Sequence, residues 1–209
     1  MYISKDSIIS ESSYCPDDLM DSSLDPMWTE VDFIATPTAS AEGADGYQTD
    51  IASGSQNGKK VYRTAVGASR ILTTRVELAT TVNDYGGYLI YGTDITHAYV
   101  VQIFREANDW KVRAFYDNNG SLTFFSTTNG LSNGNIWLSM AISNTHIQFF
   151  SNIAGDSAEP PTTGWVSLGT ELLRFLPLTG SMIEGFFAVN WGTNPECSLK
   201  VKRFRSYIS

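Results

Sequence analysis

Apolar and polar residues alternate along much of the chain, and this period of two predicts β-strands. The clearest case is NIWLSMAISNTHIQFFSN at residues 135–152, where two alternating runs flank the turn-forming Ser143-Asn144-Thr145. One face of these runs carries Ile136, Leu138, Met140, Ile142, Ile147 and Phe149. The other face carries Trp137, Ser139, Ala141, Ser143, His146, Gln148 and Phe150. The pattern predicts an antiparallel hairpin with one core face and one semi-polar face.

Similar runs follow one another from residue 69 onward, separated by turn residues. Asp117-Asn118-Asn119-Gly120 lies between WKVRAFY and SLTFFST, and Asn-Gly between alternating runs is a strong hairpin signal. Residues 24–34, LDPMWTEVDFI, predict an earlier strand that begins after Pro26. By contrast, residues 35–60 are rich in Ala, Ser, Thr, Gly and Asp and predict a long loop.

Helices have almost no place in this pattern. TELLRFL at residues 170–176 predicts a single helical turn, and no amphipathic helix lies between the strands. A parallel sheet is excluded, because each crossover would need about a dozen residues or more. The sequence therefore predicts an all-β fold, an antiparallel β-sandwich of the jelly-roll type. We assign residues 24–209 to the sandwich and the polar, irregular residues 1–23 to an N-terminal arm.

Composition fits this fold and limits the partners. Charged residues make up 17% of the 209 residues, against about 25% in an average domain, so Ser, Thr, Asn and Gly supply much of the polar surface. The net charge of −8 disfavours nucleic acid as a partner, because phosphate repels an acidic protein. The closing LKVKRFRS predicts a solvated basic strand, with a docking patch for an acidic neighbour as the alternative. Its basic residues are Lys200, Lys202, Arg203 and Arg205.

The sequence also bears on membranes, secretion and redox chemistry. No apolar run is long enough to span a membrane, so we expect no membrane insertion. The first residues lack the basic and apolar blocks of a secretory signal. Cys15 and Cys197 lie near opposite ends of the chain and predict free thiols, with a bridge between the arm and the last strand as the alternative.

Several motifs resemble the concanavalin A-like lectin/glucanase superfamily, most of all its laminin-G-like and glycosidase-associated members. They are IWLSMAI, HIQFFSN, GWVSLG, GFFAVNW, the closing SLKVKRFRSY and the early LDPMWTEV. The resemblance covers most of residues 24–209. It implies two curved antiparallel sheets, with saccharides bound on the concave face or on loops at its rim.

The resemblance also offers an enzyme branch, the laminarinase-like glycosidases with a Glu-x-Asp-x-x-Glu strand. Glu30 and Asp32 match the first two positions, but Ala35 occupies the place of the acid/base. A retaining mechanism needs two carboxyl groups about 5–5.5 Å apart. We therefore predict that the chain is not an enzyme.

No metal or cofactor is predicted. His97 and His146 stand about fifty residues apart and match no zinc spacing. Calcium is the commonest ion of the resembled superfamily, but DNNGS at residues 117–121 lacks the spacing of a calcium loop. As a hairpin turn it needs no ion.

A saccharide site needs an aromatic plane and groups that hydrogen-bond hydroxyls. The stretch NWGTN makes Trp191 the best candidate, because Gly, Thr and Asn surround it as the chain leaves a strand. The full set of candidates is Asn190, Trp191 and Asn194; Tyr91 and Asp94 in YGGYLIYGTD, which also contains Tyr85 and Tyr88; and His146 with Gln148. An ordinary structural role is the alternative for each.

Three functions remain open at this point. The first is a non-catalytic carbohydrate-recognition module that binds host glycans. The polar arm, the few lysines and cysteines and the missing signal match, by analogy, phage tail-fibre, baseplate or capsid-decoration proteins. We therefore expect a virion protein made in the host cytoplasm, whose arm or basic last strand contacts other virion proteins. The second is a purely structural virion or cement protein, and the third a glycosidase-like enzyme. A homo-oligomer is left open.

Overall fold

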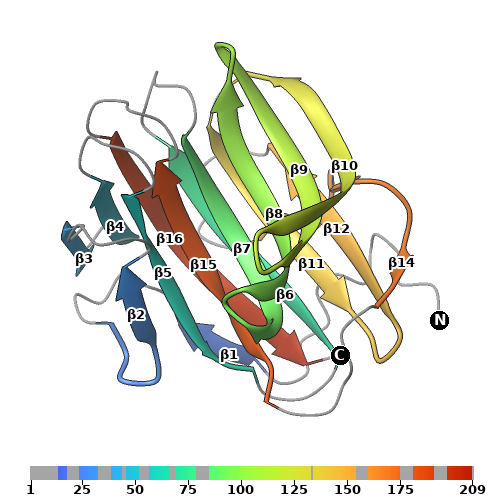
Figure 1. Cartoon of the computed structure of the whole chain (residues 1–209), viewed down its shortest axis with the longest axis horizontal. Helices are drawn as coiled ribbons and strands as arrows, with labels where there is room; N and C mark the ends of the chain where they lie inside the picture. Colours follow the sequence, from blue (N-terminus) through green and yellow to red (C-terminus); the bar gives the residue numbers. More distant parts are fainter. Residues whose placement is uncertain are drawn as a thin grey trace.

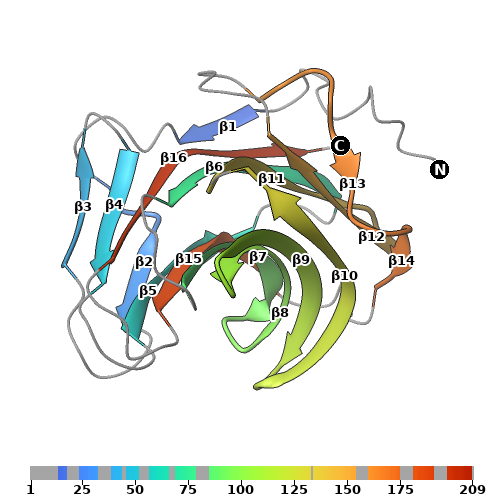
Figure 2. The same ribbon diagram turned by 90° about the horizontal axis from the view of Figure 1, so that it is seen from above.

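The computed structural model describes residues 14–17, 24–32, 39–43, 46–51, 57–65, 69–78, 85–132, 134–153, 160–174, 181–190 and 197–208. Strands form two sheets, and every strand pair in them is antiparallel. Figures 1 and 2 show the sheets as two stacked layers. The predicted all-β jelly-roll sandwich is confirmed.

The nine-stranded sheet is called the back sheet, and the seven-stranded sheet the front sheet. The back sheet contains β1 (Tyr14–Asp17), β3 (Ala39–Gly43), β4 (Gly46–Ile51), β6 (Arg70–Leu78), β11 (Asn135–Ile142), β12 (His146–Asn152), β13 (Val166–Ser167), β14 (Leu172–Leu173) and β16 (Cys197–Ile208). The front sheet contains β2 (Thr29–Asp32), β5 (Asn57–Thr64), β7 (Tyr85–Asp94), β8 (His97–Glu106), β9 (Asp109–Asn118), β10 (Ser121–Leu131) and β15 (Ile183–Asn190).

Strands far apart in sequence lie side by side in both sheets. The back sheet has the order β13-β12-β11-β6-β16-β4-β3, with β1 on β16 and β14 on β12. The front sheet has the order β10-β9-β8-β7-β15-β5-β2. In Figure 2, β9 and β10 curve strongly at one side of the front sheet. Two register shifts interrupt the pairing of β10 with β9.

The main core fills the space between the sheets. Alternate residues of each strand point inward, as the period of two requires. From the back sheet come Leu72, Leu138 and Met140; from the front sheet come Val101 and Phe186. Burial of these apolar side chains is the main source of stability, at about 25 cal/mol per Å².

The predicted hairpin at residues 135–152 is confirmed as β11 and β12. Its expected core face does point inward, but its other face is not semi-polar. Trp137 and Phe150 are 0% and 1% exposed. They lie in a second apolar cluster on the outer side of the back sheet, together with Trp165 and Tyr207. The alternation indicated which residues face each side, but not that a later segment covers the outer face.

Two predicted irregular segments contain strands. Residues 35–60 were predicted as a loop, yet they contain β3, β4 and the first residues of β5. Tyr47 and Thr49 of β4 are each 1% exposed, because β4 pairs with β16. In the predicted helical turn, Leu172 and Leu173 form β14, which pairs with β12. In both segments the partner strand is distant in sequence, so no local pattern announced the pairing.

The hairpin turn at Asp117–Gly120 is confirmed and has the expected geometry. Asn119 and Gly120 have φ angles of 51° and 89°, the left-handed conformation that Asn and Gly tolerate best. The backbone N–H of Gly120 donates to Asp117 Oδ1 at 2.7 Å. This turn carries the end of β9 and the start of β10 over the outer face of the front sheet (Figure 1).

The first and last strands of the described chain, β1 and β16, pair with each other. In β1, Cys15 lies opposite Ser206, whereas Cys197 is the first residue of β16. At about 3.3 Å per residue, the two cysteines are therefore roughly 30 Å apart. A disulfide needs Cα atoms within about 7 Å, so the alternative of a bridge between them is excluded.

The basic last strand lies inside the back sheet, flanked by β6 on one side and by β4 and β1 on the other. Lys202 pairs with Glu77 at 2.7 Å, and Arg205 is only 4% exposed. Its backbone edges are thus already occupied, and a role in docking stays a prediction. The described part of the chain contains no helix that is long and apolar enough to span a membrane.

Candidate functional site

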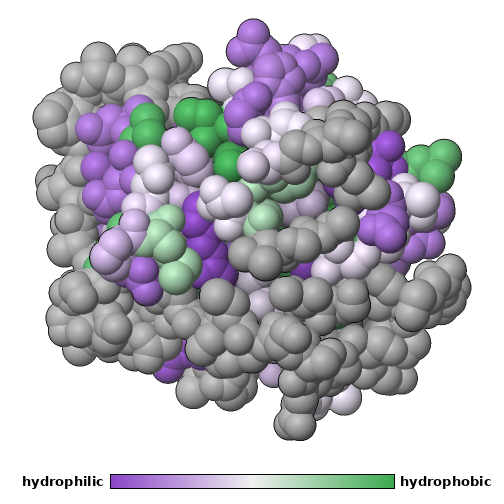
Figure 3. Space-filling model, turned by 90° about the horizontal axis from the view of Figure 1, so that it is seen from below, coloured by the Kyte–Doolittle hydropathy of each residue, from purple (hydrophilic) through white to green (hydrophobic). Residues whose placement is uncertain are grey.

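A groove of about 340 Å³ is hollowed into the outer face of the front sheet. It is lined by Lys60, Tyr88, Val100, Arg113, Phe115, Asp117, Gly120, Leu122, Phe187 and Val189. These residues come from six strands and from the turn between β9 and β10. The front sheet curves around this hollow (Figure 2), so the groove lies on the concave face. At the lower end of the sandwich, seen from below, small apolar areas lie between hydrophilic ones (Figure 3).

One straight row of residues crosses five strands beneath the groove, and all its members except Gln102 line the hollow. Lys60 of β5 pairs with Phe187 of β15, which pairs with Tyr88 of β7. Tyr88 pairs with Gln102 of β8, which pairs with Arg113 of β9. Residues in register across antiparallel strands point to the same face. The row therefore places two aromatic residues between polar ones along the concave face.

Hydrogen bonds connect one half of this row. Gln102 Nε2 donates to Tyr88 Oη at 3.0 Å, and Arg113 Nε donates to Gln102 Oε1 at 2.6 Å. At the other end, Lys60 Nζ donates to the carbonyl of Ile95 at 3.2 Å and lies 4.8 Å from the ring centre of Phe187. The polar groups are thus held in fixed positions before any ligand arrives.

Aromatic rings surround Arg113. Its guanidinium lies 4.1 Å from the ring centre of Phe104, 5.1 Å from that of Phe124 and 5.6 Å from that of Phe115. Phe124 is 52% exposed and Leu122 42%, although both are large and apolar. They form the rim that β10 contributes to the groove.

Gly86 makes room for the central row. A Cβ atom at this position would lie 2.7 Å from Nε2 of Gln102. Glycine therefore allows the Gln102 amide to lie beside β7 and reach Tyr88. A larger residue would displace the amide and interrupt the hydrogen bonds of the row.

Burial controls the charge states in the groove. It raises the pKa of the Tyr88 phenol well above its usual value, and the opposing effect of Arg113 is smaller, so the hydroxyl is neutral at neutral pH. Burial also lowers the pKa of Lys60, although the charges of Asp117 and Asp94 act in the opposite direction. The pKa of Arg113 is lowered by burial as well, but a guanidinium stays protonated in proteins.

The structure does not bring the sequence-predicted site residues together. His146 and Gln148 lie on the outer face of the back sheet, where Gln148 donates to Ser167 Oγ at 3.1 Å. Tyr91 is 0% exposed in the core between the sheets. A sugar therefore cannot contact Tyr91 in this conformation.

The other predicted residues lie at opposite ends of the front sheet. Asn190 ends β15 opposite Tyr85, and Asp94 ends β7 opposite His97. Trp191 and Asn194 fall outside the described residues. Among the described residues that the sequence predicted for the site, Asp94 lies nearest the groove, since its charge acts on Lys60.

The carboxylate of Asp94 organises the turn between β7 and β8. Burial alone would raise its pKa, but hydrogen bonds from Thr96 and His97 outweigh this effect and lower the pKa from 3.8 to about 2. The bonds include those from the backbone N–H groups of Thr96 and His97, at 2.7 and 2.9 Å. A carboxylate whose folded pKa is depressed stabilises the fold above its unfolded pKa.

We expect the Asp94 carboxyl to titrate near pH 2, measured by carbon NMR of the side chain. Its contribution to stability is present above pH 3.8 and is lost as the pH falls toward 2. Since the side chain is 51% exposed, Asp94→Asn should lower the free energy of unfolding at pH 5 by less than about 1 kcal/mol. A midpoint near 3.8 would contradict the hydrogen-bonded turn.

Metal ligands and paired carboxylates are not assembled in the described part of the chain. No group of three or more His, Cys, Asp and Glu residues gathers there in a way that could hold a metal ion. The two carboxylates of the enzyme-like motif make structural contacts: Tyr47 donates to Glu30, and Asp32 pairs with Lys59 at 3.0 Å. The prediction that the chain is not an enzyme stays a prediction.

Comparisons with known proteins bear on the fold. No family model matches the chain, and no curated protein matches it. A GH43 protein from Bacillus licheniformis, BlXynB, is similar with a TM-score of 0.71 at 13% identity, covering 96% of this chain and 40% of that one. This chain therefore spans about two fifths of the length of that protein.

Two lectin domains are similar over most of their length. The carbohydrate recognition domain of Emp47p has a TM-score of 0.62 at 11% identity, with 96% of each chain covered. The VIP36 exoplasmic/lumenal domain, in a Ca²⁺/Man3GlcNAc-bound form, has a TM-score of 0.61 at 10% identity, with 88% of this chain and 84% of that one covered. At these identities the likeness shows the fold alone, a lectin-like jelly roll.

Proposed function

We propose that this chain is a carbohydrate-recognition domain that holds one or two sugar units in the concave groove of the front sheet. The observation that carries the proposal is the cross-strand row from Lys60 to Arg113, in which two aromatic rings lie between polar groups. The volume of the groove, about 340 Å³, is near the lower end of the range for small-ligand pockets, about 300–1,000 Å³. A short glycan segment fits a hollow of this size.

The chemistry of the groove suits a sugar. An aromatic ring packs against the apolar C–H face of a pyranose, and fixed polar groups bind its hydroxyls. Phe124 offers an exposed ring at the rim. Asp117 uses one carboxylate oxygen for Gly120, and the other has no hydrogen bond within the described residues, so it can accept one from a hydroxyl.

The similar lectin domains support this proposal, because one is named as a carbohydrate recognition domain and another was solved with a glycan. The groove of this chain differs from a calcium-dependent site, because its polar groups are side chains that need no ion to be held in place. We therefore expect binding to persist in a chelator.

Phe124→Ala tests the proposal. A glycan array should first identify a bound glycan, whose affinity is then measured by titration calorimetry in the presence of EDTA. Loss of the rim ring should weaken binding by about tenfold, which corresponds to about 1.4 kcal/mol. The melting temperature should change little, since Phe124 is half-exposed.

Leu173→Ala is the matched control. Leu173 is 67% exposed, but it lies on β14 of the back sheet, away from the groove. Its replacement should leave the affinity unchanged. If the full chain binds no glycan on the array, or if both variants bind as tightly as the unsubstituted chain, the proposal is wrong. A purely structural role is then favoured.

The virion setting is a finer part of the proposal and rests on the sequence profile alone. By that analogy, the domain is displayed on a phage tail or capsid, with residues 1–23 or the basic last strand against other virion proteins. The fold and the groove do not bear on this setting. Labelling of purified particles with an antibody against the domain tests it.

A further inference from the structure

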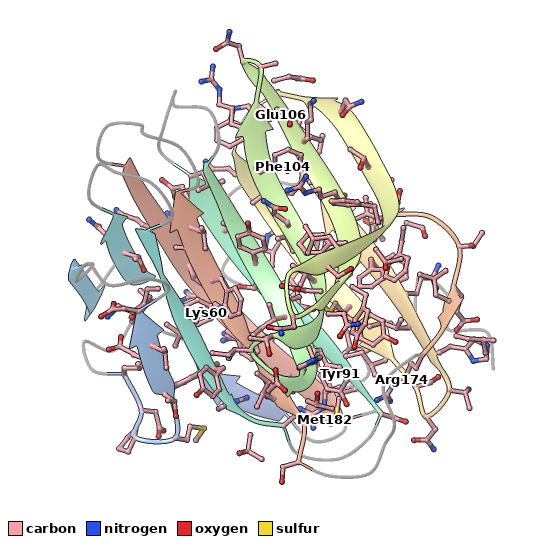
Figure 4. All side chains as sticks on the ribbon, in the orientation of Figure 1. Lys60, Tyr91, Phe104, Glu106, Arg174 and Met182 are labelled. Carbon is pink, nitrogen blue, oxygen red and sulfur yellow. The ribbon has the colours of Figure 1, made fainter. Side chains whose placement is uncertain are left out.

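Arg113 is a cation in the groove that feels the charge of one carboxylate, Glu106, without direct contact. Among the described residues, no ion pair joins its guanidinium to a carboxylate. Glu106, on the neighbouring strand, is engaged by Lys111 at 2.7 Å instead. In Figure 4, Glu106 and Phe104 lie toward the same end of the β8–β9 hairpin. An unpaired charge among aromatic rings is poorly solvated, so an anion placed beside it would be bound strongly.

The other groove cation is balanced differently. Lys60 is influenced by the charges of Asp117 and Asp94. Two of the buried arginines of the molecule, Arg63 and Arg70, share Glu184 between the sheets. Arg113 feels the charge of Glu106, but that carboxylate pairs with Lys111. Within the described chain, Arg113 therefore differs from Arg63 and Arg70 in having no ion pair of its own.

The guanidinium is also held in position for a ligand. Its Nε donates to Gln102 Oε1, and its plane lies near the Phe104 ring, 4.1 Å from the ring centre. The two terminal nitrogens have no hydrogen bond to the described residues. A carboxylate can accept two parallel N–H bonds from an arginine at once, whereas a neutral sugar hydroxyl cannot.

We propose that the groove selects a glycan that contains an acidic sugar, whose carboxylate binds the terminal nitrogens of Arg113. This inference rests on the proposed function and specifies its ligand class. It also sets an orientation. Asp117 lies four residues along β9 from Arg113, roughly 13 Å away, so the acidic sugar lies at the Arg113 end and neutral hydroxyls lie at the Asp117 end.

The net charge of −8 opposes an acidic ligand at long range. At physiological salt, however, charges more than about 8 Å apart are largely screened. The guanidinium of Arg113, which lies close to the bound ligand, therefore decides whether acidic or neutral glycans bind more tightly. Because Arg113 is surrounded by apolar rings, its interaction with a bound carboxylate is screened less than the surface charges are.

The test compares matched acidic and neutral glycans on the full chain. The probes are oligogalacturonate against its methyl ester, and sialyllactose against lactose. At least one acidic member should bind about tenfold or more tightly than its neutral counterpart. Arg113→Gln should remove that preference, and Arg113→Lys should restore only part of it, because an ammonium lacks the planar pair of donors.

Lys202→Gln is the matched control. It removes the same unit of charge, but it lies on β16 of the back sheet, where Lys202 pairs with Glu77 at 2.7 Å, away from the groove. It should keep the acidic preference. The melting temperature of each variant shows whether the fold is retained, and Arg113→Lys keeps the inference testable should Arg113→Gln not fold.

The outcomes separate the two proposals. If neutral glycans bind as tightly as acidic ones and Phe124→Ala still weakens them, the acidic inference is overturned and the glycan-binding groove stands. Equal acidic preference in Arg113→Gln and the unsubstituted chain also overturns it. If no glycan of either kind binds, both proposals fail.

Discussion

Replacing Glu184 by alanine is expected to lower the free energy of unfolding by about 3–5 kcal/mol. Glu184 is 2% exposed and accepts hydrogen bonds from Arg63 Nε at 2.9 Å, from Arg70 Nη1 and from Ser206 Oγ at 3.1 Å. Arg63 and Glu184 belong to the front sheet, whereas Arg70 and Ser206 belong to the back sheet. The carboxylate thus neutralises two buried cations and joins the sheets.

The large effect arises from what the substitution leaves behind. Without Glu184, two guanidinium groups remain between the sheets without the anion that compensates their desolvation. Urea unfolding followed by tryptophan fluorescence measures the loss. For a chain of this size, each kcal/mol should lower the melting temperature by about 2–4 °C.

Glu106→Ala is the control for this prediction. Glu106 also pairs with a cation, Lys111 at 2.7 Å, but its side chain is 54% exposed. Such a pair contributes about 0–1 kcal/mol. If Glu184→Ala destabilises the chain no more than Glu106→Ala does, the buried ion cluster does not have the role assigned to it.

Phe186→Ala is expected to lower the free energy of unfolding by about 3–5 kcal/mol as well, through loss of packing. Phe186 is 1% exposed. Its ring centre lies 5.7 Å from that of Trp28, 5.4 Å from that of Tyr47 and 6.3 Å from that of Phe204. It therefore connects the segment before β2 with β4 and β16, and its removal leaves a cavity that several strands share.

Phe124→Ala serves as the comparison, since it removes the same atoms from a half-exposed position. Its loss of stability should stay below about 1 kcal/mol. The two variants then separate folding from ligand binding: Phe186→Ala lowers the stability of the fold, and Phe124→Ala lowers the affinity for the ligand. Chemical denaturation of both under the same conditions decides this. Similar losses in the two would contradict the assignment of Phe186 to the core.

The parts of the fold that could be predicted are those whose signal is local. The β11–β12 hairpin and the Asp117–Gly120 turn were predictable, because alternation and Asn-Gly act within a few residues. Strands β3 and β4 were missed, because their pairing depends on β16 near the other end of the chain. The burial of Trp137 was missed for the same reason: Trp165 covers it from a later segment.

The groove shows why the candidate site was harder to predict. Tyr88 and Tyr91 stood in the same candidate stretch, but they are separated by an odd number of positions and so point to opposite faces of β7. Tyr88 faces the groove and Tyr91 the core. No local pattern identified the outer face as concave. The partners of Tyr88 in the row, Phe187 and Gln102, come from strands that only the topology brings together.

The irregular pairing of β10 has a consequence for how the molecule behaves among copies of itself. β10 is an edge strand of 11 residues, and it carries the exposed Leu122 and Phe124. A long, regular, apolar edge would be a template for strand addition and aggregation. The register shifts after Phe124 and Thr128 bend this edge out of regular spacing, as bulges in edge strands do. The rim can therefore stay apolar for a ligand while the bulges disfavour strand addition by a second chain along it.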